Sequence, residues 1–408
     1  MYKAPVADIA HTILDVAGMG LDLQSGRFGD FSEDLLSAVL EEAGRLASDE
    51  VEPFVTAAEK TGAKLENGMV TMPAGWQDVW NSFVEGGWNS VASPEAYGGQ
   101  GLPLTVSMAA LEIWNSCSLA FGLCPTLTSG AVEALNAHAS DELKDRYLPK
   151  MISGEWTGTM NLTEPQAGSD LGAIRTRAER MPDGTYRIFG QKIFITFGEH
   201  DLSGNIIHLV LARVSDAPAG TRGISLFVVP KFIPDADGNP GARNDVICAS
   251  IEHKLGIHCS PTCVMIYGDG KGADATPGAI GWLVGEENRG LAHMFTMMNN
   301  ARLAVGMQGV AIAEGATQKA ISFAKERRQG REAGSKNPAM SPIIVHPDVQ
   351  RMLLTMKSHT QAARSICYAC AVAIDRSQAG EHAAFWADRA AFLTPLAKAF
   401  ATDVGMEV

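Results

Sequence analysis

The sequence is short of positive charge. Lys and Arg number 33 against 46 Asp and Glu, which gives a formal net charge of −13 and argues against a nucleic-acid-binding protein. The N-terminus carries acidic residues and only a broken apolar stretch, so it resembles neither a secretory signal nor a membrane span. With 408 residues, 46% of them hydrophobic, we expect a cytoplasmic globular protein of about two to three domains.

Cysteine is also sparse, and its pattern excludes a disulfide framework. The seven cysteines are odd in number and irregularly spaced, which fits a reducing compartment. Cys367 and Cys370 form a CxxC inside an Ala-rich apolar run, so we expect them to be buried in a helix rather than to serve redox chemistry or bind a metal. A second group matches no common zinc spacing, and we expect no metal there. Its members are His253, His258, Cys259 and Cys263.

The first part of the chain has helical periodicity. Apolar residues recur at helical spacing over 31–51, with Ser32 as the predicted N-cap and Pro53 as the predicted stop. A second region, 105–151, is rich in Ala, Leu and Met, which favour helix. We therefore predict that the chain begins with a mainly α-helical domain.

After residue 158 the pattern changes to short runs rich in Ile, Val, Phe and Tyr between Gly, Asp and Pro turns. The six runs are YRIFGQKIFIT, IIHLVLARV, GISLFVVP, DVICASIE, TCVMIYG and IGWLVG. Such regular spacing predicts a compact antiparallel β-barrel.

Helical periodicity returns in the last third of the chain. Long helices are predicted over residues 291–327 and 346–377, and small residues on the first allow close packing in a bundle. A third helix reaches Val408 without a terminating signal, so we expect an incomplete bundle. The prediction is an α+β protein with an N-terminal helical domain, a middle antiparallel β-barrel and an incomplete C-terminal helical bundle. The predicted segments are an N-terminal extension at 1–30, the helical domain at 31–157, the barrel at 158–285 and the bundle at 286–408.

Two short motifs in the middle region carry the most specific signal. LTEPQAGSD at 162–170 is followed by GQKIFIT at 190–196. Taken singly, each would be an ordinary polar loop or strand. Together, in this order and inside an α–β–α chain, they resemble the two flavin-contacting segments of the acyl-CoA dehydrogenase family. The resemblance extends over residues 31–408 and implies FAD as the cofactor.

The resemblance implies a set of flavin contacts. Thr163 would offer its hydroxyl and backbone N–H to the flavin ring, while Gly168 and Ser169 would let backbone donors approach phosphate oxygens. Phe194 stands where the family usually has Trp and would stack on the flavin, with the Thr196 hydroxyl on the same face. The expected cofactor contacts are Met160, Leu162, Thr163, Gly168, Ser169, Phe194, Ile195, Thr196, Arg327 and Gln329.

The resemblance also implies substrate contacts and a partner subunit. Asn299 and Arg302 resemble the segment that contacts the acyl-CoA, where a guanidinium suits CoA phosphates or amides, and Ser169 is a further expected substrate contact. Arg327 and Gln329 resemble a segment that reaches the flavin pyrophosphate of a neighbouring subunit, which implies a homodimer or homotetramer. The alternatives are a structural ion pair for Arg302 and a solvated basic helix end for Arg327.

The implied reaction removes a proton from the carbon next to a thioester and a hydride from the following carbon. It needs a carboxylate base and donors to the thioester oxygen, while FAD takes the hydride. In most of the family the base is a Glu in a segment expected beyond Val408, and the alternative position holds Ala301. Glu164 is expected to be structural. The catalytic residue is therefore unknown, and we expect a truncated fragment or a natural short relative with little dehydrogenase activity and weakened FAD retention.

Three further segments resemble a long branch of the family that acts on short-chain or methylthio-substituted acyl-CoA thioesters. They are MYKAPVADI, MMNNARL and HPDVQRMLL. We therefore predict an oxidoreductase of fatty acid metabolism that converts such a thioester to the 2-enoyl-CoA, with electron-transfer flavoprotein as electron acceptor. The alternatives are a non-catalytic flavin or acyl-CoA binding scaffold and a flavin oxidase or monooxygenase of the same fold.

Overall fold

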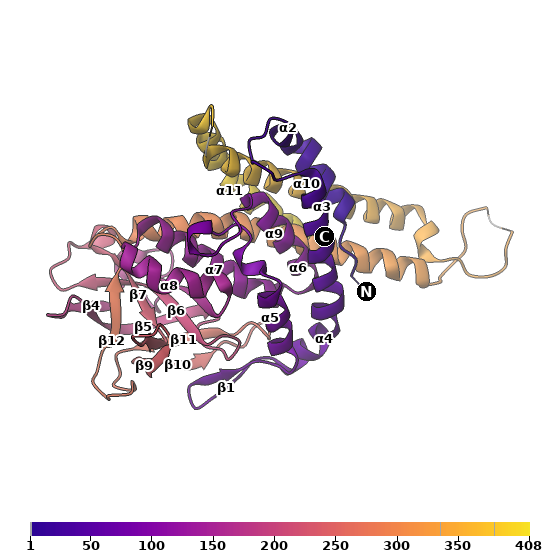
Figure 1. Cartoon of the computed structure of the whole chain (residues 1–408). Helices are drawn as coiled ribbons and strands as arrows, with labels where there is room; N and C mark the ends of the chain where they lie inside the picture. Colours follow the sequence, from indigo (N-terminus) through magenta and orange to yellow (C-terminus); the bar gives the residue numbers. More distant parts are fainter. Residues whose placement is uncertain (1, 335, 379) are drawn as a thin grey trace. The chain divides into compact units, whose positions relative to one another are not determined.

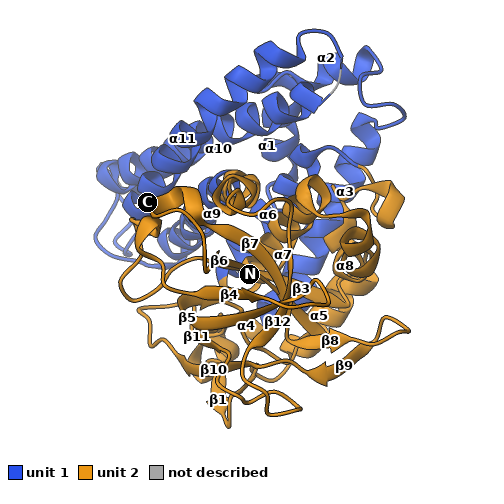
Figure 2. Ribbon diagram, turned by 90° about the vertical axis from the view of Figure 1, so that its left-hand side faces the viewer, with its two compact units in different colours: residues 1–53, 102–119, 302–408 blue, residues 54–101, 120–301 orange. Residues whose placement is uncertain are grey.

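The computed structural model describes residues 2–334, 336–378 and 380–408, with helices towards both ends of the chain and most of the strands between them (Figure 1). The chain divides into two compact units (Figure 2). Unit 1 comprises Met1–Pro53, Leu102–Leu119 and Arg302–Val408, and unit 2 comprises Phe54–Gly101 and Ala120–Ala301. Each unit combines segments that are distant in sequence, so the linear division into four segments stays a prediction. In the described part of the chain, we find no helix long and apolar enough to cross a bilayer.

Unit 1 is built mainly of helices. They are α1 (Val6–His11), a π-helical turn (Thr12–Val16), α2 (Met19–Gln24), α3 (Glu33–Arg45) with a π-helical continuation (Leu46–Val51), α6 (Leu104–Cys117), most of α9 (Gly290–Glu326), α10 (Pro347–Gln378) and α11 (Ala383–Glu407). The Ser32 cap is confirmed, because its hydroxyl accepts a hydrogen bond from the Leu35 N–H at 3.2 Å. The predicted stop at Pro53 is wrong. Pro53 lies within α4 (Glu52–Thr61), which follows the π-helical segment Leu46–Val51 without a break because Glu52 has helical backbone angles, so the helix continues through the proline.

The long helices of unit 1 approach closely at glycines and enclose an ion cluster. A Cβ on Gly309 of α9 would overlap the Ala401 carbonyl of α11, so the two backbones touch where the side chain is missing. Arg364 of α10 pairs with Glu112 at 2.7 Å and with Glu314 at 2.8 Å, and the arginine is buried. Cys367 and Cys370 are fully buried on the same helix, as expected from their apolar surroundings.

Unit 2 holds the strands and the helices that cover them. Its helices are most of α4, α5 (Trp76–Glu85), nearly all of α7 (Leu119–His138), the whole of α8 (Asp141–Ser153) and the start of α9. Its strands are β1 (Lys64–Glu66), β2 (Met69–Thr71), β3 (Trp156–Asn161), β4 (Arg177–Arg180), β5 (Tyr186–Thr196), β6 (Asn205–Val214), β7 (Ser225–Pro230), β8 (Phe232–Pro234), β9 (Pro240–Arg243), β10 (Val246–Ile251), β11 (Thr262–Tyr267) and β12 (Ala279–Leu283). All six predicted strand runs are confirmed, as β5, β6, β7, β10, β11 and β12.

The main sheet closes into a barrel. Strands β5, β12, β7, β6 and β4 form a ring, because β4 pairs with both β5 and β6, while β3 joins β6 and the pair β10–β11 extends from β5. Most pairs are antiparallel, but β3–β6 and β4–β6 are parallel. The predicted barrel therefore needs a correction, since it is not purely antiparallel. Whether two strands pair parallel or antiparallel depends on how α8 and the loop after β3 lead the chain back to the sheet. The residue pattern within one strand does not encode the course of those connecting segments.

Candidate functional site

The first motif forms a tight turn directly after β3. The backbones of Glu164 and Ala167 exchange hydrogen bonds of 3.0 and 2.9 Å. The Glu164 side chain is 3% exposed and accepts from five donors, namely the Lys192 ammonium, the Thr176 N–H and hydroxyl, the Arg175 N–H and the Gln166 amide. Burial alone would raise the pKa of Glu164, but the Lys192 charge and these donors lower it below its usual value. Glu164 is thus an ionised anchor for the turn, in keeping with the structural role expected of it.

The second motif contains a β-bulge. The register between β5 and β11 shifts within residues 192–195, so Ile193 and Phe194 together oppose the single residue Val264. Phe194 has a φ of +61° and a side chain that is 58% exposed. Bulges and strained left-handed residues are frequent at functional sites. Here they place a large aromatic ring on the surface instead of in the barrel.

Direct bonds tie the two motifs together. The Ile193 N–H donates to the Thr163 carbonyl at 2.9 Å, and the Lys192 ammonium donates to the Leu162 carbonyl at 3.0 Å. Lys192 is fully buried and lies 2.8 Å from Glu164. The predicted contacts from 160–163 and from 194–196 are therefore held beside each other in unit 2.

These residues fit a flavin. Phe194 offers an exposed ring for stacking, and the partly exposed Thr163 and Thr196 offer hydroxyls. Gly168 and Ser169 are exposed, and a Cβ on Gly168 would meet no atom within 4 Å, so the turn leaves open space where backbone donors can approach a phosphate.

A buried row of hydrogen-bonded polar side chains, which was not predicted from the sequence, lies behind the first motif. The Tyr267 hydroxyl donates to Asn161 Oδ1 at 2.8 Å, Asn161 Nδ2 donates to Thr159 Oγ1 at 2.8 Å, and Thr159 Oγ1 lies 2.7 Å from His208 Nδ1. Burial lowers the pKa of His208 to about 3, so its imidazole is neutral. The sequence pattern TxTxN on β3 could have predicted these hydrogen bonds, because alternate residues of a strand share one face and the polar side chains therefore lie together. These hydrogen bonds fix β3, which carries Met160 and leads directly into Leu162.

The remaining predicted residues lie on α9 and after it. Asn299 and Arg302 are exposed on α9, Asn299 in unit 2 and Arg302 in unit 1. Arg327 and Gln329 are exposed in unit 1, where the Gln329 N–H donates to the Ser341 carbonyl at 3.0 Å. This backbone pairing orders the segment while leaving both side chains at the surface.

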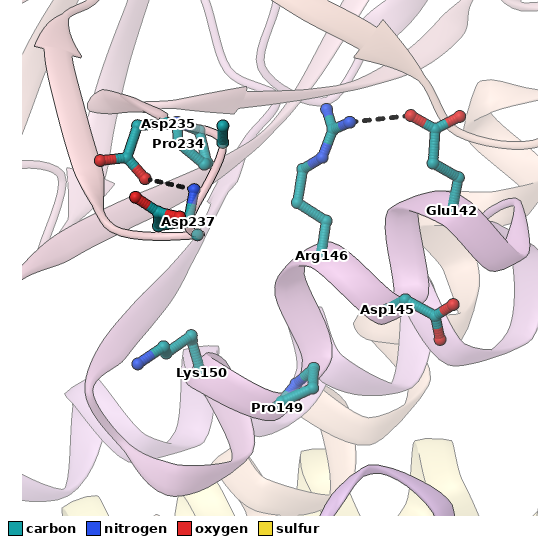
Figure 3. Close-up of a pocket in the computed structure, with 10 residues that line it drawn as sticks. Glu142, Asp145, Arg146, Pro149, Lys150, Pro234, Asp235 and Asp237 are labelled. Atoms are coloured by element: carbon teal, nitrogen blue, oxygen red, sulfur yellow. Dashed lines mark hydrogen bonds and ion pairs between the residues drawn. The ribbon is translucent and has the colours of Figure 1, made fainter.

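A surface cleft of about 640 Å³ lies elsewhere in unit 2, between α8 and the β8–β9 hairpin (Figure 3). Its charged lining residues are Glu142, Asp145, Arg146, Lys150, Asp235 and Asp237. Arg146 already pairs with Glu142 at 2.8 Å. None of the predicted flavin or substrate contacts lines this cleft, so it is separate from the paired motifs.

The chain matches three family models in succession. They describe the acyl-CoA dehydrogenase N-terminal domain at residues 34–155, its middle domain at 159–269 and its C-terminal domain at 288–408. These spans account for most of the chain and include both motifs and the segment with Asn299 and Arg302.

Individual proteins are similar to this chain over nearly its whole length. The chain is 48% identical to 3-methylmercaptopropionyl-CoA dehydrogenase of Ruegeria pomeroyi, over 100% of this chain and 68% of that protein. It is 36% identical to a butyryl-CoA dehydrogenase of Syntrophomonas wolfei, over 99% of this chain and 67% of that protein. A solved structure of an electron transferring flavoprotein of Acidaminococcus fermentans is 25% identical, with a TM-score of 0.73, and the match covers 93% of this chain and 86% of that one.

Proposed function

The chain belongs to the acyl-CoA dehydrogenase family, and we propose that it acts on a short-chain or methylthio-substituted acyl-CoA. Members of this family are FAD-dependent oxidoreductases of acyl-CoA thioesters. The relatives above act on 3-methylmercaptopropionyl-CoA and butyryl-CoA by name, which supports a short acyl group. The product would be the corresponding 2-enoyl-CoA.

The observation that carries the proposal is the pair of motifs clamped through Lys192. When bound, FAD supplies the hydride acceptor. Phe194 would stack on the flavin ring, and the hydroxyls of Thr163 and Thr196 would bond to its polar edge. The exposed Gly168–Ser169 turn would bind the phosphates through backbone donors.

Other assigned contacts complete the proposed cofactor site. Met160, Leu162 and Ile195 would line it, because they flank the two clamped segments. Arg327 and Gln329 would contact the flavin of a second copy of the chain in a homodimer or homotetramer. Their exposure in unit 1 supports this role, since both side chains are accessible to a partner.

On the substrate side, Ser169, Asn299 and Arg302 would contact the acyl-CoA. Arg302 is exposed, and its guanidinium suits the CoA phosphates. Glu164 is excluded as the base, because its oxygens already serve five donors and its charge is paired. Electron-transfer flavoprotein is the proposed acceptor of the electrons, and the cytoplasm stays the predicted location.

Anaerobic mixing tests the function. The FAD-loaded protein is mixed with 3-methylthiopropionyl-CoA or butyryl-CoA, and the absorbance of oxidised flavin is followed. Dehydrogenation bleaches the flavin without oxygen and yields one 2-enoyl-CoA per flavin. Bleaching with either substrate would overturn the low activity expected from the sequence, and bleaching with neither would refute the proposal. A product that forms only with oxygen would favour an oxidase or monooxygenase.

A further inference from the structure

One arginine of unit 2 holds the loop that follows the first motif. Arg213 lies near the end of β6, and its guanidinium donates four hydrogen bonds to backbone carbonyls. Two acceptors belong to the loop after the first motif, namely Gly172 at 2.8 Å and Ile174 at 3.2 Å. The other two, Pro218 at 3.1 Å and Gly220 at 2.6 Å, belong to the loop between β6 and β7. Arg213 therefore ties these two loops to each other.

The Arg213 guanidinium serves carbonyls and not a carboxylate. Among the described residues, no Asp or Glu forms an ion pair with it, although its side chain is half-buried. A guanidinium carries its N–H donors in a rigid plane, so it can hold several carbonyls in a fixed arrangement, which the single ammonium of lysine cannot do. The contacts of Arg213 thus set the shape of the backbone around it.

The two loops meet Arg213 in a defined conformation. The loop after the first motif is anchored at its far end, where the Arg175 N–H donates to the Glu164 carboxylate at 2.7 Å. The loop between β6 and β7 is tightly folded, because a Cβ on Gly223 would overlap the Pro218 carbonyl. Between these anchors the Gly168–Ser169 turn stays exposed. In the part of the chain that the structure describes, no residue accepts a hydrogen bond from the two N–H groups of this turn.

We propose that Arg213 is a positioning residue for the flavin phosphates: it holds the loop so that the N–H groups of the Gly168–Ser169 turn are arranged to bind them. The inference rests on the proposed function, which assigns the FAD phosphates to this turn. A loop that is already ordered loses less conformational freedom when its ligand binds, so the ligand binds more tightly. The proposed ring contact, Phe194, lies on the other motif, so Arg213 should affect the phosphates and not the ring.

FAD and riboflavin together test the proposal, because riboflavin has the same ring system without phosphates. The FAD-free protein is titrated with each flavin, and the change in flavin fluorescence gives the two Kd values. We expect R213A to raise the Kd for FAD by about tenfold, which is ~1.4 kcal/mol, and to change the Kd for riboflavin by less than about twofold. A general loss of folded structure would instead weaken the binding of both flavins.

R213K separates the hydrogen bonds from the charge. Lysine keeps the positive charge but cannot hold the carbonyls of both loops at once, so R213K should also weaken the binding of FAD and not of riboflavin. It replaces R213A in the test if R213A does not fold. An R213K variant with the wild-type ratio of the two Kd values would show that charge suffices, and it would overturn the positioning role.

R187A is the matched control. Arg187 of β5 is also half-buried and donates to the Gly278 carbonyl at 2.9 Å, in the loop before β12, so R187A should leave the ratio unchanged. Thermal unfolding shows whether each variant folds. The inference is overturned if R213A keeps the wild-type ratio, if R187A lowers it equally, or if the wild type binds FAD no more tightly than riboflavin. Failure of the FAD-loaded wild type to be reduced by acyl-CoA refutes the proposed function instead, while the two Kd values still test Arg213.

Discussion

Replacing Glu164 by Gln should open the clamp that joins the two motifs. Glu164 Oε1 accepts from Lys192 and Thr176, and Oε2 accepts from Arg175 and Gln166. A Gln amide keeps one acceptor oxygen and turns the other into a donor, so at least one backbone N–H loses its partner. The substitution also leaves the Lys192 ammonium buried without its carboxylate. Breaking one side of a buried ion pair costs about 3–5 kcal/mol.

Hydrogen–deuterium exchange measures this loss of stability at individual backbone amides. Amide protection in β3 and β5 should fall by about two to three orders of magnitude in E164Q, since each 1.4 kcal/mol is tenfold. FAD retention should fall with it. E179Q is the matched control, because the Glu179 carboxylate on β4 pairs with Arg177 at 2.9 Å but is about half exposed, and surface pairs contribute little.

A double substitution sharpens the test. E164Q/K192M removes the ammonium together with the carboxylate, so it should cost less than the sum of the two single variants. Unchanged protection in E164Q, or costs that add, would refute the view that a charged pair holds the motifs together.

Three further outcomes are expected. F194A should lose FAD during gel filtration while F194W retains it, and equal retention by the two variants would contradict stacking. In the FAD-free state F194G should unfold at a higher temperature than F194A, because glycine relieves ~1 kcal/mol of backbone strain at φ +61°. G309A should destabilise unit 1 more than G306A in urea titrations. A Cβ at Gly309 would overlap a backbone carbonyl, whereas a Cβ at Gly306 would lie 3.0 Å from the nearest carbonyl oxygen. A larger loss of stability in G306A would contradict the prediction. Burial raises the pKa of Asp375 to about 6, above its value in the unfolded chain. The free energy of unfolding of unit 1 should therefore fall as pH rises from about 4 to 6, and D375N should make it depend less on pH. A wild-type unfolding free energy that rises over this pH range would contradict the prediction.

Much of the fold could be predicted because it depends on local patterns. The six strand runs, the Ser32 cap and the long helices α9 and α10 follow from residue spacing and capping chemistry. Pro53 shows the limit, since proline usually ends a helix from inside, whereas here the residues before it form the π-helical segment Leu46–Val51 and the helix continues through the proline. The parallel pairings of β3 and β4 depend on the return path of the chain, which no single strand encodes.

The candidate site divides in the same way. The two motifs and Phe194 could be picked out from residue order, and the match to the acyl-CoA dehydrogenase middle domain spans both segments, while their flavin contacts stay a proposal. Lys192 was not recognisable as the clamp, because its partners Leu162 and Glu164 lie in the other motif and meet it only in the folded barrel. The same holds for Asn161, whose partner Tyr267 comes from a distant strand.

The sequence by itself determined the family, the α–β–α order of elements and the positions of the two motifs proposed to bind flavin, because these are properties of consecutive residues. Only the tertiary structure decided that Phe194 stands exposed on a bulge and that Lys192 ties the motifs together. Those features arise where strands and helices distant in sequence come into contact, and burial then sets the charge and hydrogen-bonding demands of the groups enclosed there.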